Sequence, residues 1–151
     1  TKFSNNIQYN IFISFDIDNQ LKNELKKTIY NGYNINVHYN SKDYFSLISK
    51  SDIGIVAGGI TMFEYAFIGI PTISIPQHNH QIRNIKILNE KGVTLIGSKN
   101  ININKDFLYK NLDKLLYNYK LRIKMNKLAK TEVDGKGVIR ISKLISNCIL
   151  K

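Results

Sequence analysis

The stretch that decides the fold is Asp52-Ile-Gly-Ile-Val-Ala-Gly-Gly-Ile-Thr-Met-Phe-Glu64. Its first half is a short apolar run, which is typical of a strand buried on both faces of a parallel sheet. Gly58-Gly59 then interrupts the run, and a helical pattern follows from Thr61 to Ile68 until Gly69-Ile70-Pro71 stops it. A buried strand that passes through a glycine turn into a helix predicts one repeat of an α/β sheet.

The same alternation of short strands and helices continues on both sides of this stretch. The predicted strands are 11–15, 35–39, 52–57, 72–76 and 93–96, and the predicted helices are 19–30, 42–50, 61–68, 79–91 and a helical region from Lys105 that breaks near 134–137. Five such strands predict a Rossmann-like α/β fold, a doubly wound parallel sheet with helices on both faces. No linker or repeat divides the chain, so we expect residues 1–151 to form a single nucleotide-sugar-binding domain, excised from a two-domain protein.

Composition limits the function classes. The chain has 151 residues, 43% of them hydrophobic, a net charge of +11 and a single cysteine, Cys148, for which we expect a buried apolar position. The lysines are spread over every segment without an Arg-rich run, so nucleic-acid binding is not predicted. A generally positive surface is compatible with peripheral contact with an anionic membrane. No apolar run is long enough to span a bilayer, and we expect a cytoplasmic protein.

The glycine turn is the first candidate for chemistry. Gly58 and Gly59 have no Cβ, so a phosphate can approach the backbone closely, and the following helix N-terminus offers unpaired N–H groups. Thr61 and Glu64 are three residues apart and share a helix face. Thr61 is suited to a phosphate, and the Glu64 carboxylate is suited to the two hydroxyls of a ribose. The same spacing also fits a capping box, in which Glu64 only caps its own helix.

A second polar cluster follows the strand 72–76. His80, Gln81 and Asn84 open the next helix, where they are suited to hydrogen bonds with a sugar or a diphosphate. His78 and His80 have neither a carboxylate nor a cysteine beside them, so no metal site is predicted. We expect no cofactor.

These motifs together resemble the C-terminal domain of the GT-B glycosyltransferases. The block from Asp52 to Glu64, then Gly69-Ile-Pro71, Gln81 with Asn84, and Glu90-Lys-Gly92 is similar to the peptidoglycan UDP-N-acetylglucosamine transferase and to the pseudaminic acid UDP-sugar hydrolase and spore-coat polysaccharide group. The ending, Asp134-Gly-Lys-Gly-Val-Ile-Arg140, resembles the hydrolase branch.

The resemblance implies a UDP-sugar site in surface glycan synthesis, used for glycosyl transfer or for hydrolysis. The diphosphate would lie across Gly58, Gly59, Ile60 and Thr61, with Glu64 on the ribose and His80, Gln81 and Asn84 near the sugar or diphosphate. Uracil would lie near 39–42. No catalytic residue is assigned, because catalysis in these families belongs largely to an N-terminal acceptor domain that is missing from this chain.

One loop departs from the family pattern. Where a glycine pair follows the first strand in the family, this chain has Phe15-Asp16-Ile17-Asp18-Asn19. The two carboxylates would repel a diphosphate, and they fit either a helix cap at Asp18 or Asn19 or an Asp-x-Asp metal pair. The departure leaves open an alternative function, a non-catalytic nucleotide-sugar-binding or docking module that has lost turnover.

Overall fold

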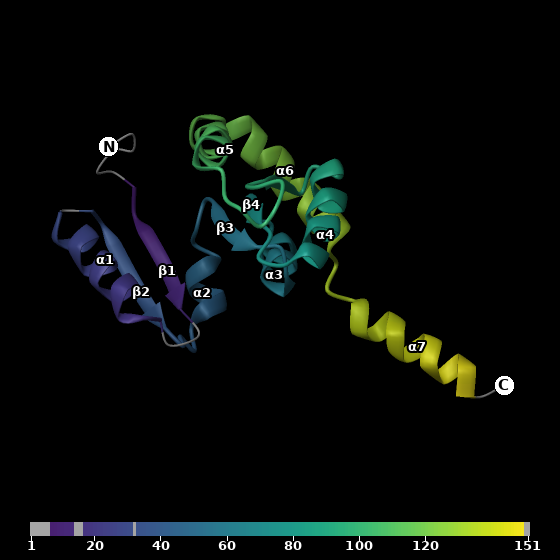
Figure 1. Cartoon of the computed structure of the whole chain (residues 1–151). Coiled ribbons are helices and arrows are strands. Elements are labelled where there is room, and N and C mark those ends of the chain that lie inside the picture. The colour runs from purple at the N-terminus through teal and green to yellow at the C-terminus, as the bar shows by residue number, and fades with distance from the viewer. Residues whose placement is uncertain (1–6, 14–16, 32, 150–151) are drawn as a thin grey trace. The chain divides into compact units, whose positions relative to one another are not determined.

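The computed structural model describes residues 7–13, 17–31 and 33–149 (Figure 1). The chain divides into two compact units, residues 1–47 and 48–151, and each is described by itself. The assignment of residues 1–151 to one nucleotide-sugar-binding domain stays a prediction.

The first unit contains two parallel strands and a helix. Strand β1 (Tyr9–Ile13) pairs with β2 (Ile35–Tyr39), and α1 (Asn19–Tyr30) connects them; α2 (Tyr44–Ile48) follows. Phe12 lies opposite His38, and their rings stack with centroids 4.8 Å apart. His38 Nε2 lies 3.0 Å from Asn10 Oδ1. These contacts make the His38 ring part of the packing of the first unit.

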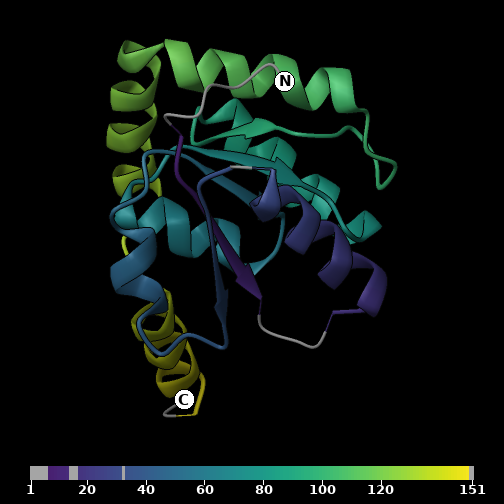
Figure 2. The same cartoon turned by 90° about the vertical axis from the view of Figure 1, so that its left-hand side faces the viewer.

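The second unit is built on a three-stranded parallel sheet in the order β3-β4-β5. Its elements are β3 (Gly54–Ala57), α3 (Ile60–Ile68), β4 (Thr72–Ile75), α4 (Asn79–Glu90), β5 (Thr94–Ile96), α5 (Lys105–Tyr117), α6 (Tyr119–Glu132) and α7 (Gly137–Ile149). Figure 2 shows the green α5 and the yellow-green α6 meeting at a sharp corner, and Asn118 lies at that corner. Each sheet connection contains one helix, as the alternating pattern predicts.

Helices cover both faces of this sheet. On one face, the Tyr65 ring of α3 lies over Gly54, where a Cβ would come within 2.4 Å of Tyr65 Cε1. On the other face of the sheet, Ile73 of β4 packs with Leu115 of α5 and Met125 of α6. All three of these side chains are buried. The sheet is therefore doubly covered, as predicted.

A small polar network is buried between β4 and β5. Thr94 Oγ1 donates to the Thr72 carbonyl at 3.1 Å and lies 2.9 Å from Thr72 Oγ1 and 2.8 Å from Ser74 Oγ. All three residues are almost fully buried. Because each hydroxyl has a partner, the sheet carries these polar groups without an unsatisfied donor or acceptor.

The C-terminal helix α7 is amphipathic, yet none of its residues is buried. Its large apolar residues Val138, Ile139, Ile141, Leu144, Ile145 and Ile149 are 54–80% exposed. Cys148 on the same helix is also exposed, so the prediction of a buried position for it is wrong. The apolar periodicity predicts a face that needs a partner, and among the described residues that face has none. Within the described ranges, no helix combines the length and the apolarity that a membrane span requires.

The predicted elements match the structure closely, and the strands pair within each unit. The five strands are hydrogen-bonded as one pair and one triplet, and every pairing is parallel. Periodicity identifies a strand, whereas its neighbour is chosen by tertiary contacts that the periodicity does not encode.

Candidate functional site

The two glycines at the end of β3 have different roles. The Gly58 N–H donates to the Ile75 carbonyl at 3.1 Å, which extends the β3–β4 pairing by one residue. A Cβ on Gly58 would come within 2.5 Å of Ile85 Cδ1 and 3.2 Å of Gln81 Cβ. Gly58 therefore lets α4 pack closely against the end of β3, and its N–H is already used within the sheet.

Gly59 begins the helix. It is the N-cap of α3, and no side chain caps this end. Thr61 is then the second helical residue, so it does not occupy the N-cap position that a capping box requires. The capping-box interpretation of Thr61 and Glu64 is therefore wrong. The predicted helix 61–68 begins one residue later than α3, because Gly59 is the N-cap of the helix and does not belong only to the turn.

Thr61 and Glu64 lie on one flank of α3. This flank lies between the two sides of the helix. The buried side carries Met62, Tyr65 and Ala66, and the exposed side carries Ile60, Phe63 and Phe67. Both side chains are half-buried. Within the described part of the chain, neither the Thr61 hydroxyl nor the Glu64 carboxylate has a hydrogen-bond or ion-pair partner. Glu64 is thus held on a helix and remains free to accept hydrogen bonds.

The start of α4 lies against this turn. The Gln81 side chain is only 9% exposed, and its Oε1 accepts a hydrogen bond from the Gln77 N–H at 2.9 Å. Its Nε2 lies 3.4 Å from the position that a Cβ on Gly59 would occupy. Gln81 therefore joins the loop after β4 to the turn after β3, with its amide group beside Gly59.

His80 and Asn84 lie on the same side of α4 as Gln81. His80 is exposed, Asn84 is half-buried, and neither makes a hydrogen bond to the rest of the described chain. The His78 and His80 rings stack with centroids 5.6 Å apart and planes 8° apart. Nowhere in the described ranges do three or more His, Cys, Asp or Glu side chains gather in a way that would hold a metal ion.

The helix ends at this site differ from the others in the chain. The N-termini of α1, α5 and α6 are closed by the side chains of Asp18, Asn104 and Asn118, which accept from first-turn amides at 2.7, 3.0 and 2.9 Å. By contrast, α3 and α4 have no side-chain cap and no acidic residue in the first turn. Two uncapped, uncompensated helix N-termini therefore lie side by side, and each is a favourable place for an anion.

The remaining predicted positions are accounted for as follows. Asp18 caps α1 through the Leu21 amide, as the cap interpretation expected, while residues 14–16 of that loop lie outside the described residues. The predicted uracil segment 39–42 belongs to the first unit. Sequence reasoning missed Gln77, whose N–H donates to the Gln81 side chain, and Ile85, which packs against Gly58. The spacing of Gln81 and Ile85, four residues apart on the apolar side of α4, was the available signal.

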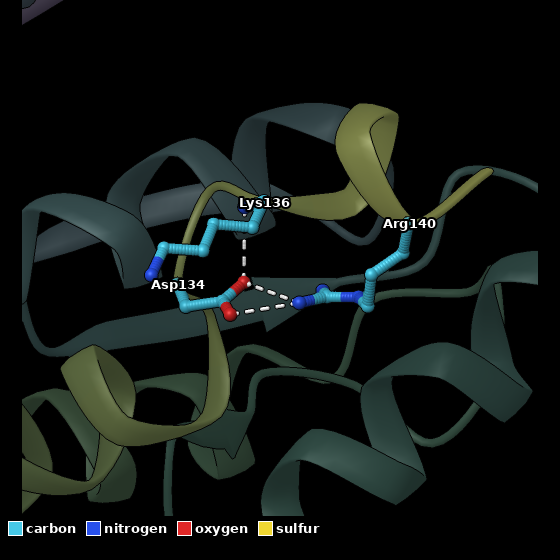
Figure 3. A network of polar contacts seen from close by, with 3 residues as sticks. All are labelled: Asp134, Lys136 and Arg140. Atoms are coloured by element: carbon cyan, nitrogen blue, oxygen red, sulfur yellow. Dashed lines mark hydrogen bonds and ion pairs between the residues drawn. The ribbon is translucent and has the colours of Figure 1, made fainter. Parts of the chain in front are cut away.

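A separate polar network starts α7 (Figure 3). The Asp134 carboxylate accepts the Lys136 N–H at 3.0 Å and two hydrogen bonds from Arg140, at 3.0 and 2.7 Å. These contacts, chiefly the Arg140 guanidinium, lower the pKa of Asp134 from 3.8 to about 2. The Asp-Gly-Lys-Gly-Val-Ile-Arg motif is thus a helix-start motif in this chain.

Two curated proteins are similar in sequence. The chain is 30% identical over 108 residues to the spore coat polysaccharide biosynthesis protein SpsG of Bacillus subtilis (strain 168), which covers 71% of this chain and 32% of that protein. It is 37% identical over 75 residues to the UDP-N-acetylglucosamine–N-acetylmuramyl-(pentapeptide) pyrophosphoryl-undecaprenol N-acetylglucosamine transferase of Ruminiclostridium cellulolyticum, covering 47% of this chain and 20% of that protein.

Two solved structures are similar in fold. They are the glycotransferase of kitacinnamycin, with a TM-score of 0.63, and the spinosyn forosaminyltransferase SpnP, with a TM-score of 0.58; both are 15% identical to this chain. The matches cover 93% of this chain but only 43% and 44% of those structures. The fold of this chain is similar to part of these GT-B glycosyltransferase structures, and the predicted resemblance is confirmed.

This chain spans about a third or less of the curated relatives and less than half of the solved structures. Its homologues are glycosyltransferase-like proteins of polysaccharide and glycan biosynthesis. A family model matches residues 2–134, which is most of the chain. The chain therefore belongs to the family described as "Protein of unknown function (DUF354)".

Proposed function

We propose that the neighbouring N-termini of α3 and α4 bind the diphosphate of a UDP-sugar, and that this chain is the donor-binding half of an enzyme of surface glycan synthesis. The observation that carries the proposal is that these two helix ends lack the caps that close α1, α5 and α6. A diphosphate would supply the negative charge that both ends lack.

The backbone at α3 offers the first donors. The Gly58 N–H is used by Ile75, so the free amides are those of Gly59, Ile60 and Thr61, and none of the three has an acceptor within the described residues. Gly59 would contribute space, since it carries no side chain at the point where a phosphate would approach. The free Thr61 hydroxyl would add a further donor. At the start of α4, His80 and the side-chain amide of Gln81 would also contact the diphosphate. Asn84 would face the sugar.

Glu64 would hold the ribose. Its carboxylate has no partner in the described chain, and it lies on the same flank of α3 as Thr61. A carboxylate accepts hydrogen bonds from two neighbouring hydroxyls at once, and such charge-assisted bonds are stronger than neutral ones.

In this proposal, the acceptor and the choice between transfer and hydrolysis are set by groups other than the residues named above. The peptidoglycan relative carries a UDP-sugar and an undecaprenol-linked group in its name. By analogy, we propose a companion N-terminal acceptor domain and a cytoplasmic protein that touches the inner face of an anionic membrane. The isolated chain is then expected to bind donor without turnover.

A second function is favoured by the first loop. Asp18 already closes the N-terminus of α1, so this helix end offers no free dipole to a diphosphate. A module that binds a nucleotide sugar but has lost turnover fits this feature. Adding the companion domain in trans separates the two proposals: release of UDP from the donor supports the enzyme, and its absence despite normal binding supports the module.

The test of donor binding is calorimetric titration with UDP up to millimolar concentration. Glu64→Gln removes the charge and keeps the shape, and loss of one charge-assisted bond pair is expected to weaken binding roughly 10- to 100-fold. Glu90→Gln, at the exposed far end of α4, is the matched control and should bind like the wild type. Equal affinity in both variants, or no binding by any of the three proteins, would contradict the proposal.

A further inference from the structure

The solvent-facing side of α6 is strongly basic. Lys120, Lys124, Lys127 and Lys130 are all exposed and lie on one side of the helix, together with Tyr119 and Ile123; we define these six residues as the basic face of α6. Lys120 and Lys130 are ten positions apart, or about 15 Å along a helix. No acidic residue lies on this face.

The opposite side of α6 is fixed by packing. Met125 and Ala129 are buried, and Asn126 Nδ2 donates to the Gly69 carbonyl at the end of α3. Because these contacts set the rotation of the helix, Lys120, Lys124 and Lys127 are held outward together. The Lys130 side chain passes close to Gly69 at the end of α3 and remains exposed. The basic face therefore belongs to the folded unit, and the helix does not rotate freely.

The charge on this face is not neutralised by the protein. Glu132, the one acidic residue of α6, forms its ion pair with Lys91 of the neighbouring C-terminal end of α4, and Asp134 pairs with Arg140. Among the described residues, no acidic side chain pairs with any of the four lysines. The face lacks the alternating charges of an ordinary solvated helix.

Exposed aromatic rings border one end of the face. Tyr117 and Tyr119, on either side of the α5–α6 corner, are 76% and 66% exposed. Arg122 lies over the Tyr119 ring, 5.5 Å from its centroid. Tyrosine rings and long lysine side chains are the groups that protein surfaces place at the headgroup level of a bilayer.

We infer that the basic face of α6 docks on a membrane surface rich in anionic phospholipid headgroups. Lysine suits this partner because it acts as a flexible point charge that follows a layer of headgroups, whereas arginine forks are the usual choice for nucleic-acid recognition. The inference rests on the proposed membrane contact of the function above, and it names the surface that makes the contact.

The experiment is co-sedimentation of the whole chain with phosphatidylcholine vesicles that contain phosphatidylglycerol, with pure phosphatidylcholine vesicles in parallel. Each lysine close to an anionic surface changes partitioning by about fivefold. Replacing Lys120, Lys124, Lys127 and Lys130 by Gln is therefore expected to lower partitioning by up to roughly 600-fold, and salt is expected to weaken the wild-type binding.

The charge-matched control replaces Lys26, Lys27, Lys50 and Lys105, which are exposed elsewhere, by Gln. Partitioning close to that of the wild type for this control supports the basic face. An equal loss in both variants would show that only net charge matters and would overturn the inference. If the α6 variant still binds the vesicles but a chain truncated after Lys136 does not, the contact belongs to α7 and the inference is overturned. Tighter binding to duplex DNA than to the anionic vesicles would also overturn the inference.

UDP titration of the α6 variant separates this inference from the donor site. Both sets of lysines are remote in sequence from the start of α3, so UDP affinity should stay at the wild-type value. A variant that binds UDP normally but leaves the vesicles supports the docking surface whatever the donor turns out to be. A variant that loses both properties would contradict it, because the lysines would then act on the fold.

Discussion

Replacing Gly58 by alanine tests how the candidate site is packed. The new Cβ would lie 2.5 Å from Ile85 Cδ1 and 2.6 Å from Ile85 Cγ1. An ordinary carbon contact is about 3.5–4 Å, so the Ile85 side chain must move by roughly 1 Å. Ile85 is almost fully buried, which leaves it little room to do so.

Overpacking of this size costs about 2 kcal/mol of unfolding free energy. In a protein of this length, that corresponds to a fall in melting temperature of roughly 4–8 °C. Chemical denaturation followed by circular dichroism measures the loss. In the double variant Gly58→Ala with Ile85→Ala, the added methyl has space. The stability loss of the double variant should therefore be smaller than the sum of the two single losses, by about 1 kcal/mol or more.

Gly59→Ala is the matched comparison. A Cβ there would have its nearest contact at 3.4 Å, on Gln81 Nε2, so stability should change by less than about 0.5 kcal/mol. The same methyl would stand where a phosphate is proposed to bind, and UDP affinity should fall. If Gly58→Ala unfolds at the wild-type denaturant concentration, or if its loss adds fully to that of Ile85→Ala, the packing described here is incorrect.

Three further predictions concern other parts of the chain. Asp134 should titrate near pH 2, so its link to Arg140 is complete above about pH 4 and is lost as the pH falls through 2; carboxyl NMR measures this, and Arg140→Gln should return the midpoint toward 3.8. Thr94→Val leaves buried hydroxyls without a partner and should cost about 2 kcal/mol by urea denaturation, whereas an unchanged midpoint would argue against the buried network. Truncation after Lys136 removes α7, in which no described residue is buried, so the melting temperature should stay within about 2 °C of the wild type; a larger fall would mean that α7 is packed in solution.

The sequence predicts the elements of this fold well, because its turn chemistry and its apolar periods agree. The helix 19–30 and the strand 35–39 have the bounds that the structure shows, and Gly69 ends α3 with a φ of 89°, as a C-terminal glycine should. Errors occur where local pattern and tertiary contact compete. A lone cysteine was expected to be buried, but Cys148 is exposed on α7, because the residue type does not specify a partner that covers this helix.

The candidate site could be predicted only in part, for a similar reason. The glycine pair and the polar start of α4 are visible in the sequence, and both lie at the turns that the structure brings together. The different roles of Gly58 and Gly59 cannot be predicted from the sequence, because they depend on Ile85 and Ile75, which come from two other elements. The choice between a capping box and a free Glu64 depended on a one-residue difference in where α3 begins.

The most direct test of the central claim is to map UDP binding by amide NMR shifts over the whole chain. If the ends of α3 and α4 hold the diphosphate, the largest shifts should fall on the Ile60, Thr61 and His80 amides, and the Gly58 amide, which is bonded to Ile75, should move less. The same titration of Gly59→Ala should reduce these shifts at equal UDP concentration. Shifts concentrated on the lysine-rich helices instead, or the same shifts in Gly59→Ala as in the wild type, would contradict a diphosphate site at these helix ends.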